Sequence, residues 1–299
     1  MPELLALDDA LAQLLDTLQP LSDTECLPTS QALGRVLARD VISVCDVPPA
    51  DNSAMDGYAL RAADAGQELP VTQRIPAGSV GQPLAAGEAA RIFTGAQVPP
   101  GADAVVMQEQ TELVDGRLRV RAPVTAGQHI RRQGEDVRQG SVVLPAGTRL
   151  NPMGLGLAAT AGAAEVTVSR RPRVALFSTG DELVMPGEPL PPGAIYNSNR
   201  FLLRGLLEGL GCEVLDLGIV PDSLDATRAA LREAAAQADL IVTSGGVSVG
   251  EEDHLRPAVQ AEGTLTLWAL ALKPGKPFAF GKVGGSWYVG LPGNPVSSL

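Results

Sequence analysis

The pattern of apolar and polar positions predicts an α/β arrangement for the second half of the chain. Short apolar runs at residues 174–177, 214–217 and 240–242 are separated by stretches with helical periodicity. Alternating strands and helices imply a mostly parallel sheet with right-handed crossovers. We therefore expect residues 172–299 to form a three-layer α/β domain with a mostly parallel sheet.

The middle of the chain has a different pattern. Between residues 69 and 145, short apolar runs are interrupted by Gly and Pro at the spacing of roughly 8–12 residues that is typical of all-β modules. We expect a β-rich domain over residues 45–137. It would be inserted into a helical, elongated domain made of residues 1–44 and 138–171, so the chain is predicted to combine α+β and α/β domains.

Leucines at helical spacing predict an amphipathic helix near the N-terminus, namely Leu4, Leu7, Leu11, Leu14, Leu15 and Leu18. Its apolar face needs a partner surface, which is either another part of this chain or a second subunit. A further helical turn is expected over residues 31–37. Asn199 is expected to cap a helix over residues 200–210, which Gly211 ends.

Composition and charge exclude several classes of protein. With 34 acidic and 23 basic residues the formal charge is −11, which argues against broad nucleic-acid binding. The three cysteines are scattered, without metal spacing or a disulfide framework, so a reducing cytosol is expected. No run approaches the roughly 20 apolar residues of a membrane span, and an acidic N-terminus does not fit a secretory signal.

Polar residues follow successive strands of the predicted sheet. Asp181 and Glu182 follow the first strand, Asp222 the second, a glycine-rich loop with Asp253 the third, and Asn294 comes near the end. Ligands of such sheets bind beyond the carboxyl ends of the strands, so these loops are expected to share one crevice. Lys273 and Lys276 supply positive charge that the overall composition lacks.

The glycine-rich loop is the part of this crevice with the clearest chemistry. Its small residues let the backbone approach an anion closely; they are Ser244, Gly245, Gly246, Ser248 and Gly250. A Walker loop would continue with Lys and Ser or Thr, whereas Glu251 and Glu252 follow here. Phosphate together with carboxylates suggests a bridging hard cation such as Mg²⁺. The alternative is a strand-to-helix turn whose acids favour the helix N-terminus.

Two segments of the β-rich region also carry polar side chains. Residues 51–58 bring Asp51, Asn52, Ser53, Asp56 and Tyr58 together within a few positions, where turn formation by Asx and Ser side chains is one explanation. Thr94 either donates to a ligand phosphate or satisfies its own loop. Arg131 and Arg132 precede Glu135 and Asp136, and solvated salt bridges are the default interpretation of that arrangement.

Six motifs together resemble the MoeA-type molybdopterin molybdenumtransferases, whose eukaryotic counterpart is the gephyrin E domain. They are NSAMDGYA (52–59), TGA (94–96), STGDEL (178–183), SGGVSVG (244–250) with Asp253, KPGKPF (273–278) and LPGNP (291–295). The motifs follow the family order from about residue 30 to the end. They are long and unusual, which makes the resemblance specific.

The resemblance implies that the protein inserts molybdate into adenylylated molybdopterin with Mg²⁺ and releases AMP, in the last step of molybdenum cofactor synthesis. The implied catalytic residues are Asp56, Thr94, Glu182, Asp222, Asp253 and Lys273. The implied cofactor-binding residues are Ser244, Gly245, Gly246, Ser248, Gly250, Lys276 and Asn294. The implied metal ligands are Asp181, Glu182, Asp222 and Asp253.

The resemblance also implies a cytoplasmic homodimer in which the Asp56 module of one subunit faces the sheet crevice of the other. Contacts with other proteins of cofactor synthesis are expected, and nucleic acid or membrane partners are not. Two departures stand out. Ala269 follows Trp268 where many relatives carry a basic residue, and the chain stops at Leu299, whereas the family continues for roughly a hundred residues as a C-terminal β-barrel.

Two other functions remain open at the level of sequence. The α/β half alone resembles domains of the competence-damage-inducible proteins, which hydrolyse nucleotide pyrophosphates, although that interpretation leaves residues 52–58 unexplained. A scaffold like gephyrin at synapses is the third candidate. The acid cluster with Lys273 favours an enzyme, since a scaffold has no need of metal ligands.

Overall fold

The computed structural model describes residues 4–246, 254–273 and 277–299. It divides into two compact units, one made of Met1–Asp23 with Ser169–Leu299 and the other of Thr24–Val168. The N-terminal segment belongs to the same unit as the α/β residues, and the three-domain division stays a prediction.

The first unit is built on a six-stranded sheet with the order β16-β13-β17-β20-β19-β18. The strands are β13 (Arg173–Thr179), β16 (Glu213–Val220), β17 (Leu240–Ser244), β18 (Gly263–Ala269), β19 (Pro277–Val283) and β20 (Ser286–Leu291). The first four strands of this order pair in parallel, and β19 and β18 complete the sheet as antiparallel strands. The expected mostly parallel sheet is confirmed.

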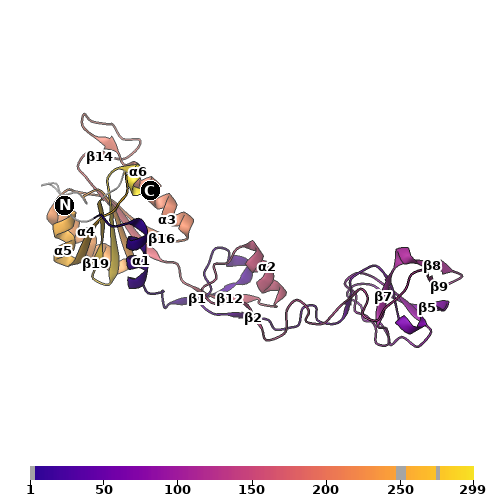
Figure 1. The fold of residues 1–299 in the computed structure, drawn as a ribbon. Coiled ribbons are helices and arrows are strands. Elements are labelled where there is room, and N and C mark those ends of the chain that lie inside the picture. Colours follow the sequence, from indigo (N-terminus) through magenta and orange to yellow (C-terminus); the bar gives the residue numbers. More distant parts are fainter. Residues whose placement is uncertain (1–3, 247–253, 274–276) are drawn as a thin grey trace. The chain divides into compact units, whose positions relative to one another are not determined.

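Helices cover both faces of this sheet (Figure 1). On one face, α4 (Leu224–Gln237) and α5 (Leu255–Glu262) pack on a core that includes Phe177 and Ile241. On the other face, α3 (Ser198–Leu210) brings Leu203 against Leu176 and Val242. Burying each large apolar side chain contributes about 1.5–3 kcal/mol. The predicted three-layer α/β domain is confirmed.

The cap of α3 differs from the sequence expectation. Asn197, not Asn199, is the N-cap, because its side-chain oxygen accepts from the backbone N–H of Arg200. Asn199 lies in the first turn, and its amide instead donates to the carbonyl of Gly293. Gly211 ends the helix in the left-handed conformation at φ 94°, as expected for a C-terminal glycine.

The predicted N-terminal helix is α1 (Leu7–Thr17). Leu5 forms a parallel bridge with Leu270, which joins this segment to the residues that follow β18. Within α1 only Ala10 is buried, whereas Leu7, Leu11 and Leu15 are exposed. Most of the apolar face of this helix is therefore uncovered by the described residues of its own unit.

A hydrogen bond joins the two places where the chain leaves and re-enters the first unit. The segment 24–168 leaves after Asp23 and returns at Ser169, and the backbone N–H of Arg170 donates to the carbonyl of Asp23 over 3.0 Å. The guanidinium of Arg170 also contacts both Asp23 and Asp239. The two ends of the long excursion are thereby fixed to each other and to the start of β17.

The second unit contains a six-stranded sheet of order β7-β4-β6-β5-β9-β8. Its strands are β4 (Gly57–Leu60), β5 (Leu69–Ile75), β6 (Ala89–Ile92), β7 (Ala104–Met107), β8 (Thr111–Val114) and β9 (Arg117–Val120). A Cβ on Gly57 would lie 1.9 Å from the carbonyl oxygen of Val106, so the close β4–β7 pairing requires glycine there. The prediction of a β-rich region is confirmed.

The rest of the second unit consists of short elements. Three two-stranded sheets pair β1 with β12, β2 with β11 and β3 with β10. Their strands are β1 (Thr24–Pro28), β2 (Val41–Ile42), β3 (Asn52–Ser53), β10 (Ile130–Arg131), β11 (Val142–Leu144) and β12 (Glu165–Ser169). Helix α2 (Pro152–Thr160) starts at an Asn151 cap.

The helical turn expected over residues 31–37 is wrong. A 3-10 helix occupies Thr29–Gln31 instead, and Gly34 then takes a left-handed φ of 76°. A right-handed helix cannot continue through that conformation. Leu37 forms an isolated antiparallel bridge with Val168 and is buried with Leu150 and Ala158.

No helix in the described part of the chain combines the length and the apolar character that crossing a bilayer requires. Cys26, Cys45 and Cys212 are free thiols.

Candidate functional site

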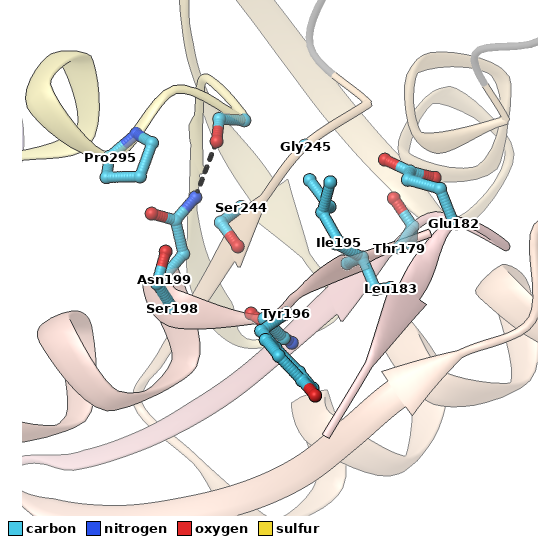
Figure 2. Close-up of a pocket in the computed structure, with 12 residues that line it drawn as sticks. Thr179, Glu182, Leu183, Ile195, Tyr196, Ser198, Asn199, Ser244, Gly245 and Pro295 are labelled. Carbon is cyan, nitrogen blue, oxygen red and sulfur yellow. Dashed lines mark hydrogen bonds between the residues drawn. The ribbon is translucent and has the colours of Figure 1, made fainter. Parts of the chain in front are cut away.

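A pocket lies at the carboxyl ends of the parallel strands in the first unit (Figure 2). Thr179 ends β13 and Ser244 ends β17, and the start of α3 and the turn after β20 complete the walls. The lining residues are Thr179, Glu182, Leu183, Ile195, Tyr196, Asn197, Ser198, Asn199, Ser244, Gly245, Gly293 and Pro295. Its volume of about 90 Å³ holds a few water molecules or part of a larger ligand.

Two buried serines join the strand ends beneath this pocket. Ser178 on β13 and Ser244 on β17 are register partners, and their hydroxyl oxygens lie 2.9 Å apart. Because a buried hydroxyl without a partner costs about 1–3 kcal/mol, this mutual bond favours serine at both positions. The bond fixes the ends of β13 and β17, from which the loops around the pocket begin.

Gly245 is needed where the chain leaves β17. Its φ is 92°, and an added Cβ would lie 3.0 Å from the carbonyl oxygen of Thr179. The N–H of Gly245 donates to the carbonyl of Leu291 over 3.0 Å. That donor is therefore already engaged, so Gly245 permits close approach of a ligand but does not offer its own N–H to a phosphate.

Two asparagines of the pocket lining each have a buried side-chain atom without a hydrogen-bond partner among the described residues. Asn199 donates through Nδ2 to the carbonyl of Gly293 over 2.9 Å, and its buried Oδ1 has no partner among the described residues. Asn197 accepts through Oδ1 from the N–H of Arg200, and its buried Nδ2 likewise has no partner in the described part of the chain. Buried polar atoms are normally hydrogen-bonded, so these two atoms have capacity for a ligand or water.

The acids predicted at the strand ends are partly brought together. Glu182 lies in the pocket wall opposite Asn199 and Pro295 (Figure 2). Asp181 accepts through Oδ1 from the backbone N–H of Asp222 over 3.2 Å, which joins the loops that follow β13 and β16. Within residues 4–246, 254–273 and 277–299, no three Asp, Glu, His or Cys side chains form a metal-binding group.

Gly180 sets the position of Glu182. It takes a φ of 141°, and an added Cβ would lie 2.5 Å from Oε2 of Glu182. The glutamate side chain therefore folds back over a position that only glycine leaves open. This is a local reason for the Gly-Asp-Glu order in the motif.

The other predicted residues of this crevice lie in different situations. Asn294 caps α6 (Pro295–Ser298) through a bond from the N–H of Val296, and Lys273 is exposed. Gly246 is half-buried. Asp253, Ser248, Gly250 and Lys276 lie outside the described residues, so their predicted roles stay predictions.

Asp56 and Thr94 are bonded to each other in the second unit. Oδ1 of Asp56 accepts from both the backbone N–H of Thr94, at 2.8 Å, and its hydroxyl, at 2.7 Å. The Thr94 N–H, then the Thr94 hydroxyl and the charge of Arg91, lower the pKa of Asp56. The carboxylate stays ionised, and Thr94 is held by Asp56 rather than free.

The acids and arginines near residue 131 form ion pairs, as expected by default. Arg131 pairs with Asp136, and Arg132 pairs with Asp51. Asp51 is therefore held by Arg132, a residue outside the polar segment 51–58. Its pKa is lowered first by the N–H of Gln133 and then by Arg132.

Sequence reasoning missed several pocket residues. Asn197 and Asn199 flank Ser198 at the start of α3, and one asparagine is enough to cap a helix. The second asparagine was therefore a surplus polar residue, a signal that could have indicated a further role. Tyr196 carried no comparable signal, and Thr179 was indicated only as a member of the STGDEL motif (178–183).

Both halves of the chain match models of known protein families. A family model described as the MoeA N-terminal region (domain I and II) matches residues 5–162. A second, described as a probable molybdopterin binding domain, matches residues 175–299. The two matches cover the second unit and the α/β unit with its pocket.

Individual relatives agree with these matches. A molybdopterin molybdenumtransferase of Haemophilus influenzae is 46% identical over 99% of this chain and 74% of its own length. One of Nostoc sp. is 39% identical over 100% of this chain and 71% of its own. The crystal structure of the molybdopterin biosynthesis moeA protein from Pyrococcus horikoshii superposes with a TM-score of 0.85 at 34% identity, covering 99% of this chain and 76% of that one.

Proposed function

This chain belongs to the MoeA family, and on that premise we propose that it inserts molybdate into adenylylated molybdopterin and releases AMP, in the last step of molybdenum cofactor biosynthesis. It is an enzyme of the molybdopterin molybdenumtransferase type, with molybdopterin and molybdate as substrates. The observation that carries the proposal is the pocket in which Glu182, Ser244 and Gly245 meet at the carboxyl ends of the parallel strands.

The pocket suits one part of a large, polar, anionic substrate. Its lining includes Asn197, Ser198 and Asn199, whose amide and hydroxyl groups are a mixture of donors and acceptors that can orient a heterocycle or phosphate. Positioning of the reacting groups alone can lower the barrier by several kcal/mol. Glu182 would orient the phosphoanhydride or accept a proton as AMP leaves.

Mg²⁺ is proposed as the ion that accompanies the substrate. Carboxylate oxygens are its preferred protein ligands, and the backbone N–H of Asp222 donates to the Asp181 carboxylate, which joins the two residues at neighbouring strand ends. The proposed ligands are Asp181, Glu182, Asp222 and Asp253. When bound, the ion would neutralise charge on the substrate phosphates.

Lys273, Asp56 and Thr94 complete the proposed machinery. Lys273 is exposed and would hold an oxyanion as a point charge. The Asp56–Thr94 pair fixes a hydroxyl and an ionised carboxylate in one place. Lys276, Gly246, Ser248, Gly250 and Asn294 are proposed as cofactor-binding residues on the strength of their motifs.

We also propose that the protein acts as a cytoplasmic homodimer that meets other proteins of cofactor synthesis. Free cysteines agree with a reducing compartment. The exposed leucines of α1 are an apolar surface that a second copy would cover.

The test is AMP release from adenylylated molybdopterin with Mg²⁺, with and without molybdate. The variants Glu182→Gln and Asp222→Asn should reduce release at least tenfold, since each removes one proposed ligand charge. Asp225→Asn is the matched control, because this exposed aspartate lies three positions after Asp222 in the first turn of α4. It should behave like the parent.

The same assay separates the alternatives. Release that does not depend on molybdate would indicate a pyrophosphate hydrolase, which the transferase relatives do not favour. Binding of the pterin without any AMP release would indicate a non-catalytic binding module. Equal activity of parent and Asp222→Asn would remove Asp222 from the machinery.

A further inference from the structure

An arginine pair, Arg74 and Arg91, lies on the solvent-facing side of the six-stranded sheet in the second unit. Arg74 on β5 and Arg91 on β6 are direct register partners, and Arg91 is also paired with Tyr58 on β4. Neighbouring strands are about 5 Å apart. Three consecutive strands therefore present Tyr58, Arg91 and Arg74 side by side in one row.

Phe93, which follows β6, brings the two charges onto one aromatic ring. The guanidinium carbon of Arg74 is 4.6 Å from the ring centroid, and that of Arg91 is 4.7 Å from it. Both charges therefore lie within about one Debye length of each other at 0.1 M salt, roughly 10 Å. Solvent ions do not screen them fully from one another.

The orientation of Arg91 is fixed by neutral partners. Its guanidinium donates to the carbonyl of Gly57 over 3.0 Å and to Oε1 of Gln108 over 2.6 Å, and it also lies over the ring of Tyr58. These contacts hold the side chain in place, and its charge also acts on the carboxylate of Asp56. Arg91 is half-buried and Arg74 is exposed.

Neither arginine forms a salt bridge within the described part of the chain, whereas fifteen salt bridges there engage twelve other arginines. Like charges at directly opposed positions destabilise a sheet. Arg91 has an acidic neighbour, Asp56, whose pKa its charge helps to lower, whereas Arg74 is exposed and makes no salt bridge among the described residues. An anion bound between them would remove the repulsion.

We propose that Arg74 and Arg91 bind a small oxyanion, either molybdate or a phosphoryl group of the adenylylated substrate. This proposal rests on the proposed function and adds a substrate-binding surface in the β-rich unit. Arg91 lies on β6 and Thr94 follows in the next loop, so the proposed surface belongs to the same part of the unit as the Asp56–Thr94 pair. A guanidinium presents planar paired donors that match tetrahedral oxyanions.

The experiment measures binding of inorganic molybdate, and separately of AMP, to the full chain by calorimetric titration. Arg74→Gln should weaken binding of at least one of these probes about tenfold, the loss expected for one charge-assisted contact. Arg74→Lys should retain most of the affinity because it keeps the charge. Arg91→Gln should act in the same direction, with its melting temperature measured to show that the sheet remains folded.

Arg121→Gln is the matched control, because it removes the same charge from a residue directly after β9 of the same sheet that pairs with Glu112. Parent-like binding by Arg121→Gln, with weakened binding by Arg74→Gln, supports the proposal. Equal affinities of Arg74→Gln and Arg121→Gln for both probes would overturn it, as would a parent that binds neither probe saturably.

The two probes identify the source of the anion. A loss confined to molybdate assigns the pair to the metal oxyanion, and a loss confined to AMP assigns it to the substrate phosphate. Failure of this proposal is separable from failure of the proposed function. If the parent releases AMP in a molybdate-dependent way while Arg74→Gln binds and reacts like the parent, only the arginine-pair proposal is rejected.

Discussion

The side-chain amide of Asn199 donates a 2.9 Å hydrogen bond to the carbonyl of Gly293, which joins the start of α3 to the turn after β20. The two residues are 94 positions apart in the chain. Both line the pocket, so this single bond holds together two of its walls.

Asn199→Ala should lower the free energy of unfolding by about 1–3 kcal/mol, because it leaves the Gly293 carbonyl without its donor. Urea denaturation of parent and variant measures the difference. Asn151→Asp is the control, since it keeps the capping oxygen of α2 at an exposed position where a carboxylate stays solvated, and Asp caps helices as well as Asn does. A loss of the same size in both variants would show that the hydrogen bond of Asn199 does not account for the lowered free energy of unfolding.

Gly180→Ala should reduce AMP release because the new Cβ would meet Oε2 of Glu182 at 2.5 Å and push the carboxylate out of place. Backbone strain at the positive φ would add a stability cost on the order of 1–3 kcal/mol.

Gly187→Ala separates the two effects. Gly187 also has a positive φ, 96°, but an added Cβ there would meet no atom within 4 Å. Melting temperatures of the two variants should fall by similar amounts, while only Gly180→Ala loses most of its activity. Equal activities would contradict the placement of Glu182 as the cause.

Arg170→Met should destabilise the first unit by about 1–2 kcal/mol at neutral pH, a figure discounted for partial exposure. Arg170 donates to both carboxylate oxygens of Asp239, each at 2.7 Å, and this contact is the first cause of the lowered pKa of Asp239. Its contribution is present above the ordinary aspartate pKa of about 3.9 and is lost as pH falls through the lower folded value.

Acid titration of stability checks this sign. The difference between the parent and Arg170→Met should shrink as pH falls below about 4. The exposed Arg119–Glu68 pair provides a control, since Arg119→Met should change stability far less. A difference that stays constant from pH 7 to pH 3 would contradict ionisation of Asp239 as its origin.

Cys26 should react slowly with iodoacetamide although its side chain is exposed. Its pKa is raised by partial desolvation and by the neighbouring Glu165 carboxylate, so less thiolate is present at neutral pH. Glu165→Gln should speed alkylation of Cys26 severalfold, as measured by mass spectrometry of its peptide. Cys212, whose pKa is raised by burial, should not respond to this substitution.

The sheet of the first unit could be predicted from the sequence because strand and helix periods differ and parallel topology follows from their alternation. Which of Asn197 and Asn199 caps α3 could not be predicted. Both are asparagines and could cap a helix equally well, and the outcome depends on Gly293, far along the chain. The same limit applies to Arg74 and Arg91. Their opposition is a matter of strand register, which no local pattern around either arginine specifies.

The bond between the backbone of Arg170 and that of Asp23 gives the chain the topology of a host with a guest inserted at one point. The guest, residues 24–168, leaves and returns through two neighbouring residues. A short turn could therefore replace it without stretching the host backbone. Residues 24–168 could therefore be exchanged for another segment at this one position while the α/β unit keeps its own backbone.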